Sequence, residues 1–164
     1  MKESDNHYAE SMYYQIAAST GNRPASAKSA RNVERQLIRK IGLDPARYKL
    51  ADGSGLSLYN YLSAELEVQL LRYAYRDDNM YQQLKQSLPI AGVDGTLKKR
   101  MRMGYAHGNV KAKTGTLTGI ISLAGYRKAA NGHELCFSII NNGIMHGNNA
   151  RNFADKVCEL LCKP

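Results

Sequence analysis

The spacing of hydrophobic residues predicts a helical first half of the chain. Tyr8, Met12 and Ile16 recur at every fourth position, which is the period of one helical face, and they predict a helix over residues 5–19. Hydrophobic residues with the same period predict three more helices, over residues 26–41, 63–75 and 80–88. Pro89 follows the last of these and ends it, because proline cannot continue a helix.

After residue 109 the pattern changes from helical to strand-like. β-branched and aromatic residues predict strands over residues 110–114, 118–128 and 134–141. Asn131-Gly132 is typical of a tight hairpin turn between the last two. A final helix is predicted over residues 148–162, with an apolar face made of Phe153, Val157, Leu160 and Leu161. Helices, an antiparallel sheet segment and a C-terminal helix, in that order, make an α+β fold rather than alternating β-α units.

Length and charge restrict the function only loosely. The 164 residues are about one domain's worth, and 43% hydrophobic content excludes a wholly disordered chain. The net charge of +9 favours an anionic partner. Residues 21–50 carry eight Lys or Arg against two acids, a net charge of +6, so most of the excess lies there. This segment is either a solvated helix surface or an anion-binding surface.

The sequence contains no sign of a cofactor or metal site. A Gly-rich phosphate loop and a dinucleotide fingerprint are both missing from the sequence, and the Cys and His residues lack zinc-site spacing. Three cysteines cannot all belong to a closed disulfide framework. Cys158 and Cys162 stand one helical turn apart, and we expect them to be small buried residues.

Two short motifs carry the candidate chemistry, Ser4-Asp5-Asn6 and Lys113-Thr114-Gly115, the second followed by Thr116. A serine hydroxyl can relay a proton, and an asparagine can accept from a lysine and donate to a carbonyl. A lysine and threonine hydroxyls can bind a carboxylate, and a glycine leaves room for a substrate backbone along a strand edge. An ordinary structural interpretation is also open, with the serine as a helix N-cap and the lysine motif as a strand end.

With two further blocks, these motifs resemble the class C low-molecular-mass penicillin-binding proteins, the D-alanyl-D-alanine carboxypeptidase/endopeptidase family. The matching blocks are Lys2–Asn6, Ala51–Asn60, Leu88–Leu97 and Val110–Gly119, in family order over nearly the whole chain. The resemblance implies a partial penicillin-binding-protein/β-lactamase-like transpeptidase fold. It also implies a serine-type peptidase that acts on D-Ala-D-Ala stem peptides of peptidoglycan through an acyl-enzyme and binds β-lactams outside the cytoplasmic membrane.

The resemblance also assigns roles to single residues. It implies catalytic roles for Ser4, Asn6 and Lys113. It implies substrate binding by Thr114, Gly115 and Thr116, with the backbone N–H of the last residue forming half of an oxyanion hole.

One family motif is missing from the sequence. In the family a Ser-x-x-Lys nucleophile motif precedes Ser-x-Asn, but no serine stands three positions before any lysine here. We therefore expect residues 1–164 to be the C-terminal part of a DD-peptidase domain without its nucleophile region, inactive alone. The groove left by the missing helix predicts self-association, a partner chain or marginal stability.

The polar N-terminus shows no signal peptide. The chain is cytoplasmic if it is a complete reading frame, whereas a longer parent would carry its export signal upstream. Two rival function classes also stay open. One is a non-catalytic remnant that binds D-Ala-ended peptides or a partner chain. The other is a nucleic-acid-binding protein using residues 21–50, which lack a recognised motif and interleaved aromatic residues.

Overall fold

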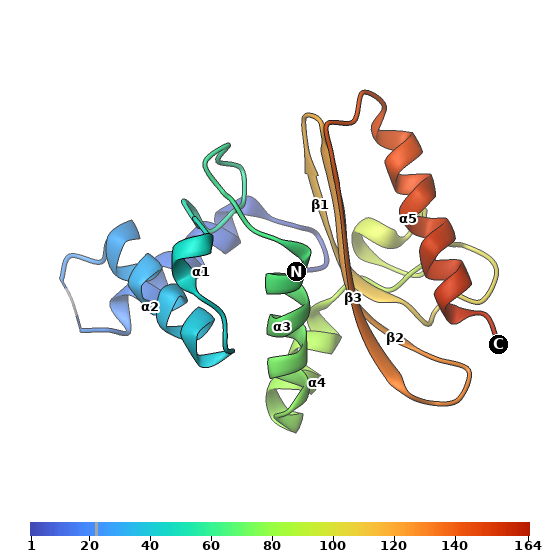
Figure 1. Ribbon diagram of the computed structural model, residues 1–164, viewed down its shortest axis with the longest axis horizontal. Helices are drawn as coiled ribbons and strands as arrows, with labels where there is room; N and C mark the ends of the chain where they lie inside the picture. Colours follow the sequence, from blue (N-terminus) through green and yellow to red (C-terminus); the bar gives the residue numbers. More distant parts are fainter. Residues whose placement is uncertain (22) are drawn as a thin grey trace. The chain divides into compact units, whose positions relative to one another are not determined.

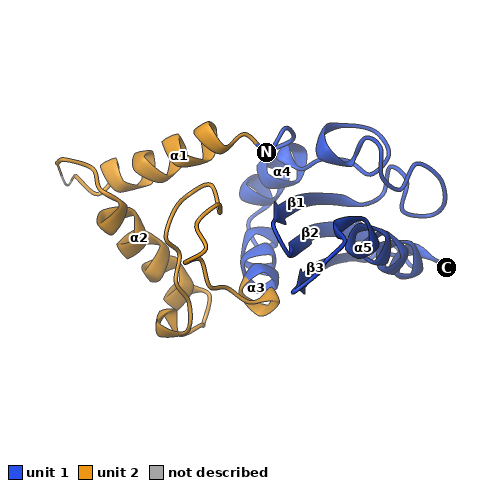
Figure 2. Ribbon diagram, turned by 90° about the horizontal axis from the view of Figure 1, so that it is seen from above, with its two compact units in different colours: residues 1–4, 67–164 blue, residues 5–66 orange. Residues whose placement is uncertain are grey.

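The computed structural model describes residues 1–21 and 23–164 and divides into two compact units (Figure 2). Unit 1 consists of Met1–Ser4 and Glu67–Pro164, and unit 2 consists of Asp5–Leu66. Among the residues described, no helix combines the length and the apolar character needed to cross a bilayer.

Unit 2 begins with two helices, α1 (Asn6–Ala18) and α2 (Ala27–Lys40), labelled in Figure 1. The Asp5 side chain caps α1 by accepting a hydrogen bond from the Tyr8 N–H at 3.0 Å. An aspartate also suits the positive end of the helix dipole. The N-cap role considered for Ser4 therefore belongs to Asp5, and Ser4 is part of unit 1.

The two helices of unit 2 pack through a small core of Tyr13, Ala17 and Ala30. The Tyr13 hydroxyl donates to the Ala27 carbonyl at 3.2 Å, which joins α1 to the first turn of α2. A Cβ on Gly53 would lie 2.5 Å from the Tyr13 Cβ, so glycine lets the following loop close over this core. A short 3₁₀ helix, η1 (Pro45–Arg47), follows α2.

The predicted apolar face of α1 is wrong. Tyr8, Met12 and Ile16 are exposed by 75%, 66% and 38%, while the face that carries Tyr13 and Ala17 is buried. The small side chain of Ala17 permits close helix packing, and the Tyr13 ring fills the space beside it. Period alone identifies candidate faces but not which of them meets a neighbour.

Unit 1 contains the sheet, and its elements follow the predicted order. They are α3 (Ala64–Tyr75, whose first turn belongs to unit 2), α4 (Asp78–Ser87), the 3₁₀ helix η2 (Gly95–Leu97), β1 (Lys111–Leu117), β2 (Ile120–Lys128), β3 (Glu134–Asn142) and α5 (Gly147–Cys162). The three strands are antiparallel in the order β1-β2-β3. The predicted α+β class is confirmed.

The β1–β2 turn lies further along the chain than predicted. The first strand was expected to end at Thr114, but it continues to Leu117 and pairs there with Ile120. Gly119 adopts a φ of +77°, so the chain reverses at this glycine and β2 begins after it. The Lys113-Thr114-Gly115-Thr116 run consequently lies wholly within β1.

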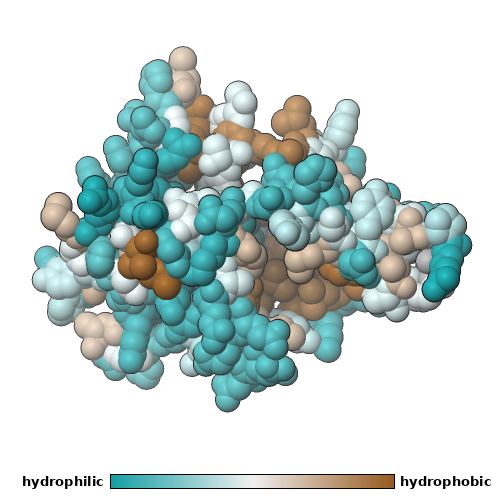
Figure 3. Space-filling view, turned by 180° about the vertical axis from the view of Figure 1, so that it is seen from behind, coloured by the Kyte–Doolittle hydropathy of each residue, from teal (hydrophilic) through white to brown (hydrophobic). Residues whose placement is uncertain are grey.

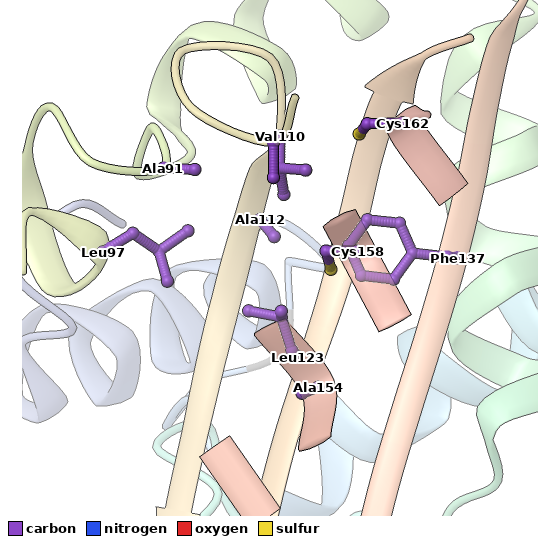
Figure 4. Close-up of a cluster of buried hydrophobic side chains, with 10 residues drawn as sticks. Ala91, Leu97, Val110, Ala112, Leu123, Phe137, Ala154, Cys158 and Cys162 are labelled. Atoms are coloured by element: carbon purple, nitrogen blue, oxygen red, sulfur yellow. The ribbon is translucent and has the colours of Figure 1, made fainter. Parts of the chain in front are cut away.

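The core of unit 1 lies between α5 and the sheet, and Figure 4 shows its side chains. α5 contributes small residues, Ala150, Ala154, Cys158 and Cys162, which are buried. These meet Val110, Leu123 and Phe137 among others. Both cysteines are free and buried, as predicted. α3 and α4 lie on the other side of the sheet, where the Tyr126 hydroxyl donates to the Leu71 carbonyl at 2.7 Å (Figure 1).

The predicted apolar face of α5 is wrong in the same way as that of α1. Phe153, Leu160 and Leu161 are 54%, 69% and 38% exposed, because the face with alanine and cysteine permits closer approach to the sheet. Hydrophobic side chains therefore reach the protein surface in several places among hydrophilic ones (Figure 3).

Candidate active site

Strand β1 presents the lysine motif at an open edge of the sheet. β1 pairs with β2 on one side only, and near its start the other side meets the preceding loop. There the Ala112 N–H donates to the Pro89 carbonyl at 3.0 Å. Alternate residues of a strand direct their backbone groups the same way, so Thr114 and Thr116 also turn theirs away from β2. The Thr116 N–H therefore lies on the edge at which an extended peptide can be added.

The Lys113 ammonium is the centre of the site. Its Nζ donates to the Ser4 Oγ at 2.6 Å and to the Thr114 carbonyl at 2.6 Å. Two motifs 109 residues apart in sequence thus meet within unit 1. Ser4 has a φ of +54°, in the left-handed region that serine rarely adopts. Such a conformation costs on the order of 1 kcal/mol or more, so the surrounding contacts must hold it.

The segment that carries Ser4 is anchored to the loop before β1. Lys2 forms a salt bridge with Asp94, and the Lys2 carbonyl accepts from the Thr96 N–H at 3.1 Å. A Cβ on Gly95 would lie 2.5 Å from the Lys2 carbonyl oxygen, so only glycine permits this approach. The hydrogen bond from Lys2 lowers the pKa of Asp94, which favours the ionised carboxylate.

Thr96 also contacts the motif strand directly. The Thr114 hydroxyl donates to the Thr96 hydroxyl at 2.9 Å. Neither Asp94 nor Thr96 was predicted as a site residue. Both belong to the Leu88–Leu97 block that carried the family resemblance, and this block was the available signal for them.

Burial determines the electrostatics of Lys113. The side chain is largely removed from solvent, and this desolvation lowers its pKa below the ordinary lysine value. Both oxygens that accept from its Nζ are uncharged. The positive charge is therefore not neutralised by either of these contacts, and it can attract an incoming carboxylate.

Gly115 has a packing role as well as its predicted role in leaving room for a substrate backbone. It pairs with Ser122 on β2, and a Cβ at this position would lie 2.3 Å from the Ser122 Oγ. The glycine therefore leaves room for the Ser122 hydroxyl on the neighbouring strand. The room that it leaves for a substrate backbone stays a prediction.

The structure brings together most, but not all, of the predicted site residues. Ser4, Lys113 and Thr114 are in contact, with Gly115 and Thr116 next on the same strand. Asn6 is the first residue of α1, is exposed and belongs to unit 2. The Ser-x-Asn motif therefore spans the boundary between the two units.

Comparisons with known proteins identify relatives of this chain. A family model described as the D-Ala-D-Ala carboxypeptidase 3 (S13) family matches residues 1–163. A D-alanyl-D-alanine carboxypeptidase of Actinomadura sp. is 41% identical over 148 residues, which cover 87% of this chain and 27% of that protein. D-alanyl-D-alanine carboxypeptidase DacB of Haemophilus influenzae is 36% identical over 150 residues, which cover 90% of this chain and 31% of that protein.

A solved structure supports the same likeness. Penicillin binding protein 4 from Haemophilus influenzae, complexed with a beta-lactam, superposes with a TM-score of 0.89 at 31% identity. The superposition covers 100% of this chain and 40% of that one. This chain thus spans less than a third of the length of the two curated relatives.

Proposed function

Because the chain belongs to the D-Ala-D-Ala carboxypeptidase 3 (S13) family, we propose that it forms the lysine and carboxylate-binding side of a serine D-Ala-D-Ala peptidase site. The proposed substrates are peptidoglycan stem peptides that end in D-Ala-D-Ala. One observation carries the proposal: the desolvated Lys113 Nζ lies 2.6 Å from the Ser4 Oγ, at a strand edge that is open to an extended peptide.

The geometry suits carboxylate binding and proton delivery. Lys113 and the hydroxyls of Thr114 and Thr116 would bind the terminal carboxylate of the peptide. Because the Lys113 Nζ donates to the Ser4 Oγ, the hydroxyl proton of Ser4 is free to go to a leaving amine. Lys113 can then reprotonate the serine, and its lowered pKa makes this transfer easier. The Thr116 N–H would supply one donor of an oxyanion hole.

The acylating serine is the part of the reaction that this sequence does not account for, since it contains no Ser-x-x-Lys. We propose that residues 1–164 are the C-terminal part of a DD-peptidase domain. Their coverage of less than a third of the curated relatives supports this. The position of β3 at an edge of the sheet also supports it, because a strand from the rest of the domain could pair there. Outside the cytoplasmic membrane, where peptidoglycan lies, is the proposed place of action of the whole protein.

We also propose that this chain self-associates through its exposed strand edge and exposed hydrophobic side chains. An edge strand and the exposed Phe153, Leu160 and Leu161 of α5 are typical sites of association. Sedimentation velocity should show a weight-average mass that rises with protein concentration. A monomer at every concentration would contradict this proposal.

A peptide titration tests the proposed function. A soluble peptide ending in D-Ala-D-Ala should shift the backbone NMR signals of Thr114 and Thr116, and Lys113→Ala should weaken its binding at least tenfold, the loss of about 1.4 kcal/mol or more. Lys111→Ala is the matched control, because Lys111 lies two residues away on the same face of β1. Equal loss in both variants, or no binding to the wild type, would contradict the proposal.

Covalent labelling separates binding from catalysis. Incubation with a fluorescent penicillin should leave the intact mass of this chain unchanged, because no Ser-x-x-Lys nucleophile is present. A stable acyl adduct would show that another serine reacts and would overturn the assigned division of roles.

A further inference from the structure

Unit 1 contains a hollow that is lined by neither Ser4 nor Lys113. It is an open hollow of about 840 Å³. We propose that it binds a small anion that carries two or more phosphate or carboxylate groups. The proposal does not rest on the peptidase function.

The hollow is rich in basic and polar side chains from several elements. They include Lys85 of α4, Lys111 at the start of β1 and Lys128 at the end of β2, with Tyr105, His107 and Asn109 from the loop before β1. The hollow is open to solvent rather than enclosed. Inorganic phosphate would fill only a small part of it.

Among the side chains that line the hollow, three lysines stand against one acid. Glu134 is its single acidic side chain, and it forms a salt bridge with Lys85 at 2.8 Å. Lys85 also donates to the Tyr81 hydroxyl at 2.6 Å. Neither Lys111 nor Lys128 forms a salt bridge in the described part of the chain, although the charge of Lys111 acts on Asp94 and helps to lower its pKa. A ligand with several negative groups would supply the missing counter-charge.

The sheet register places these two lysines as neighbours. Lys111 pairs with Tyr126, and Lys128 lies two residues further along β2 on the same face. Such diagonal positions have Cβ atoms about 7–8 Å apart, within the common reach of two long side chains. One ligand with two anionic groups can therefore contact both ammonium groups.

The loop beside the lysines is fixed. The Asn109 side chain donates to the Lys128 carbonyl at 2.9 Å and accepts from the Lys128 N–H at 2.8 Å, so it ties the loop to the strand end. Gly92 makes room for the His107 ring, because a Cβ there would lie 2.4 Å from it. These contacts hold the wall before any ligand arrives, which reduces the ordering cost of binding.

The distribution of charge between the units agrees with this placement. Unit 1 carries fifteen Lys or Arg and eight acids, a net charge of +7, whereas unit 2 carries eight and six, a net charge of +2. Elsewhere in unit 2, acidic residues offset much of the positive charge of residues 21–50. The anionic partner indicated by the composition is therefore better sought on unit 1.

Calorimetric titration with pyrophosphate and with citrate tests the site, and inorganic phosphate serves as the single-group comparison. Pyrophosphate or citrate should bind saturably and more tightly than phosphate. Lys111→Ala and Lys128→Ala should each weaken binding about tenfold. Lys156→Ala, which removes an exposed charge from α5 outside the hollow, is the matched control and should bind like the wild type.

The outcomes distinguish this site from the peptidase site. Lys113→Ala should lose binding of the D-Ala-D-Ala peptide but keep binding of pyrophosphate. Lys128→Ala should keep binding of the peptide but lose binding of pyrophosphate. The proposal is overturned if no saturable binding of either polyanion occurs, or if Lys156→Ala weakens binding as much as Lys128→Ala. It is also overturned if Lys113→Ala abolishes pyrophosphate binding, because the anion would then occupy the motif site.

Discussion

The two units differ in how they are held together. Unit 1 buries a continuous cluster of ten residues between α5 and the sheet, including Leu123 and Phe137. The buried cluster of unit 2 has three members among the described residues, and helix caps and hydrogen bonds supplement it. Hydrophobic burial scales with the apolar area removed from water, so unit 1 is the better scaffold for a precisely placed lysine.

The candidate site reflects this difference. Ser4, Lys113 and Thr114 are positioned by contacts within unit 1 alone. Asn6, two residues after Ser4, belongs to unit 2. The charged half of the site is therefore formed within one unit.

The largest expected effect is in the core of unit 1. Leu123 is completely buried, so Leu123→Ala should lower the free energy of unfolding by about 2–5 kcal/mol through lost burial and a cavity. Leu58→Ala in unit 2 should change it by less than about 0.5 kcal/mol, because that side chain is 78% exposed. Denaturant unfolding measures both values. Equal effects would show that Leu123 does not contribute to a well-packed core of unit 1.

A smaller effect is expected from the caps of unit 2. The Ser26 Oγ accepts from the Ser29 N–H at 3.2 Å and begins α2. Ser26→Ala should therefore cost about 1 kcal/mol. Ser11→Ala is the control, since this serine is exposed within α1 and bonds only the His7 carbonyl one turn back. A change at Ser26 no greater than at Ser11 would mean that the cap does not support unit 2.

The smallest effect depends on pH and arises at Glu34 of α2. Burial raises the pKa of this carboxyl to about 7, although Arg31 opposes the shift. The Glu34 Oε2 and the Tyr48 hydroxyl line one cavity of about 30 Å³, and neither has a hydrogen-bond partner among the described residues. Because the folded pKa exceeds the unfolded one, the folded state holds the proton more tightly. Wild-type stability should fall as pH rises from about 4.5 through 7.

Glu34→Gln should reduce this fall in stability with rising pH. The total reduction should be less than about 1 kcal/mol once solvent screening is allowed for. Glu65→Gln removes an exposed carboxylate from the same unit and serves as the control. Thermal unfolding at several pH values gives both slopes. An unchanged slope in Glu34→Gln would show that this carboxyl is not desolvated.

Much of the fold was predictable because its signals are local. The order of elements, the turn at Asn131-Gly132 and the burial of both α5 cysteines follow from period and turn chemistry. The motifs also predicted that Ser4 and Lys113 belong to one site. The prediction that they meet across 109 residues came from the family resemblance, since no local rule joins them.

The errors arose where tertiary contacts decide. Both α1 and α5 bury a face with alanine instead of the bulkier hydrophobic face that was predicted. Close packing selected these faces, and spacing cannot reveal the partner surface. Ser4 was also considered as a cap, whereas Asp5 is the cap and Ser4 adopts a positive φ beside Lys113. The roles of Asp94 and Thr96 likewise depend on where residues 1–4 lie.

The most direct test of the account is an NMR titration of the Lys113 ammonium in the wild type and in Ser4→Ala. Desolvation should place its pKa below the ordinary lysine value of about 10.4. Loss of the Ser4 oxygen removes an acceptor that stabilises the charged form, so Ser4→Ala should lower the pKa further. A wild-type Lys113 that titrates at or above the ordinary value, unchanged by Ser4→Ala, would contradict the central claim of a desolvated lysine bonded to Ser4.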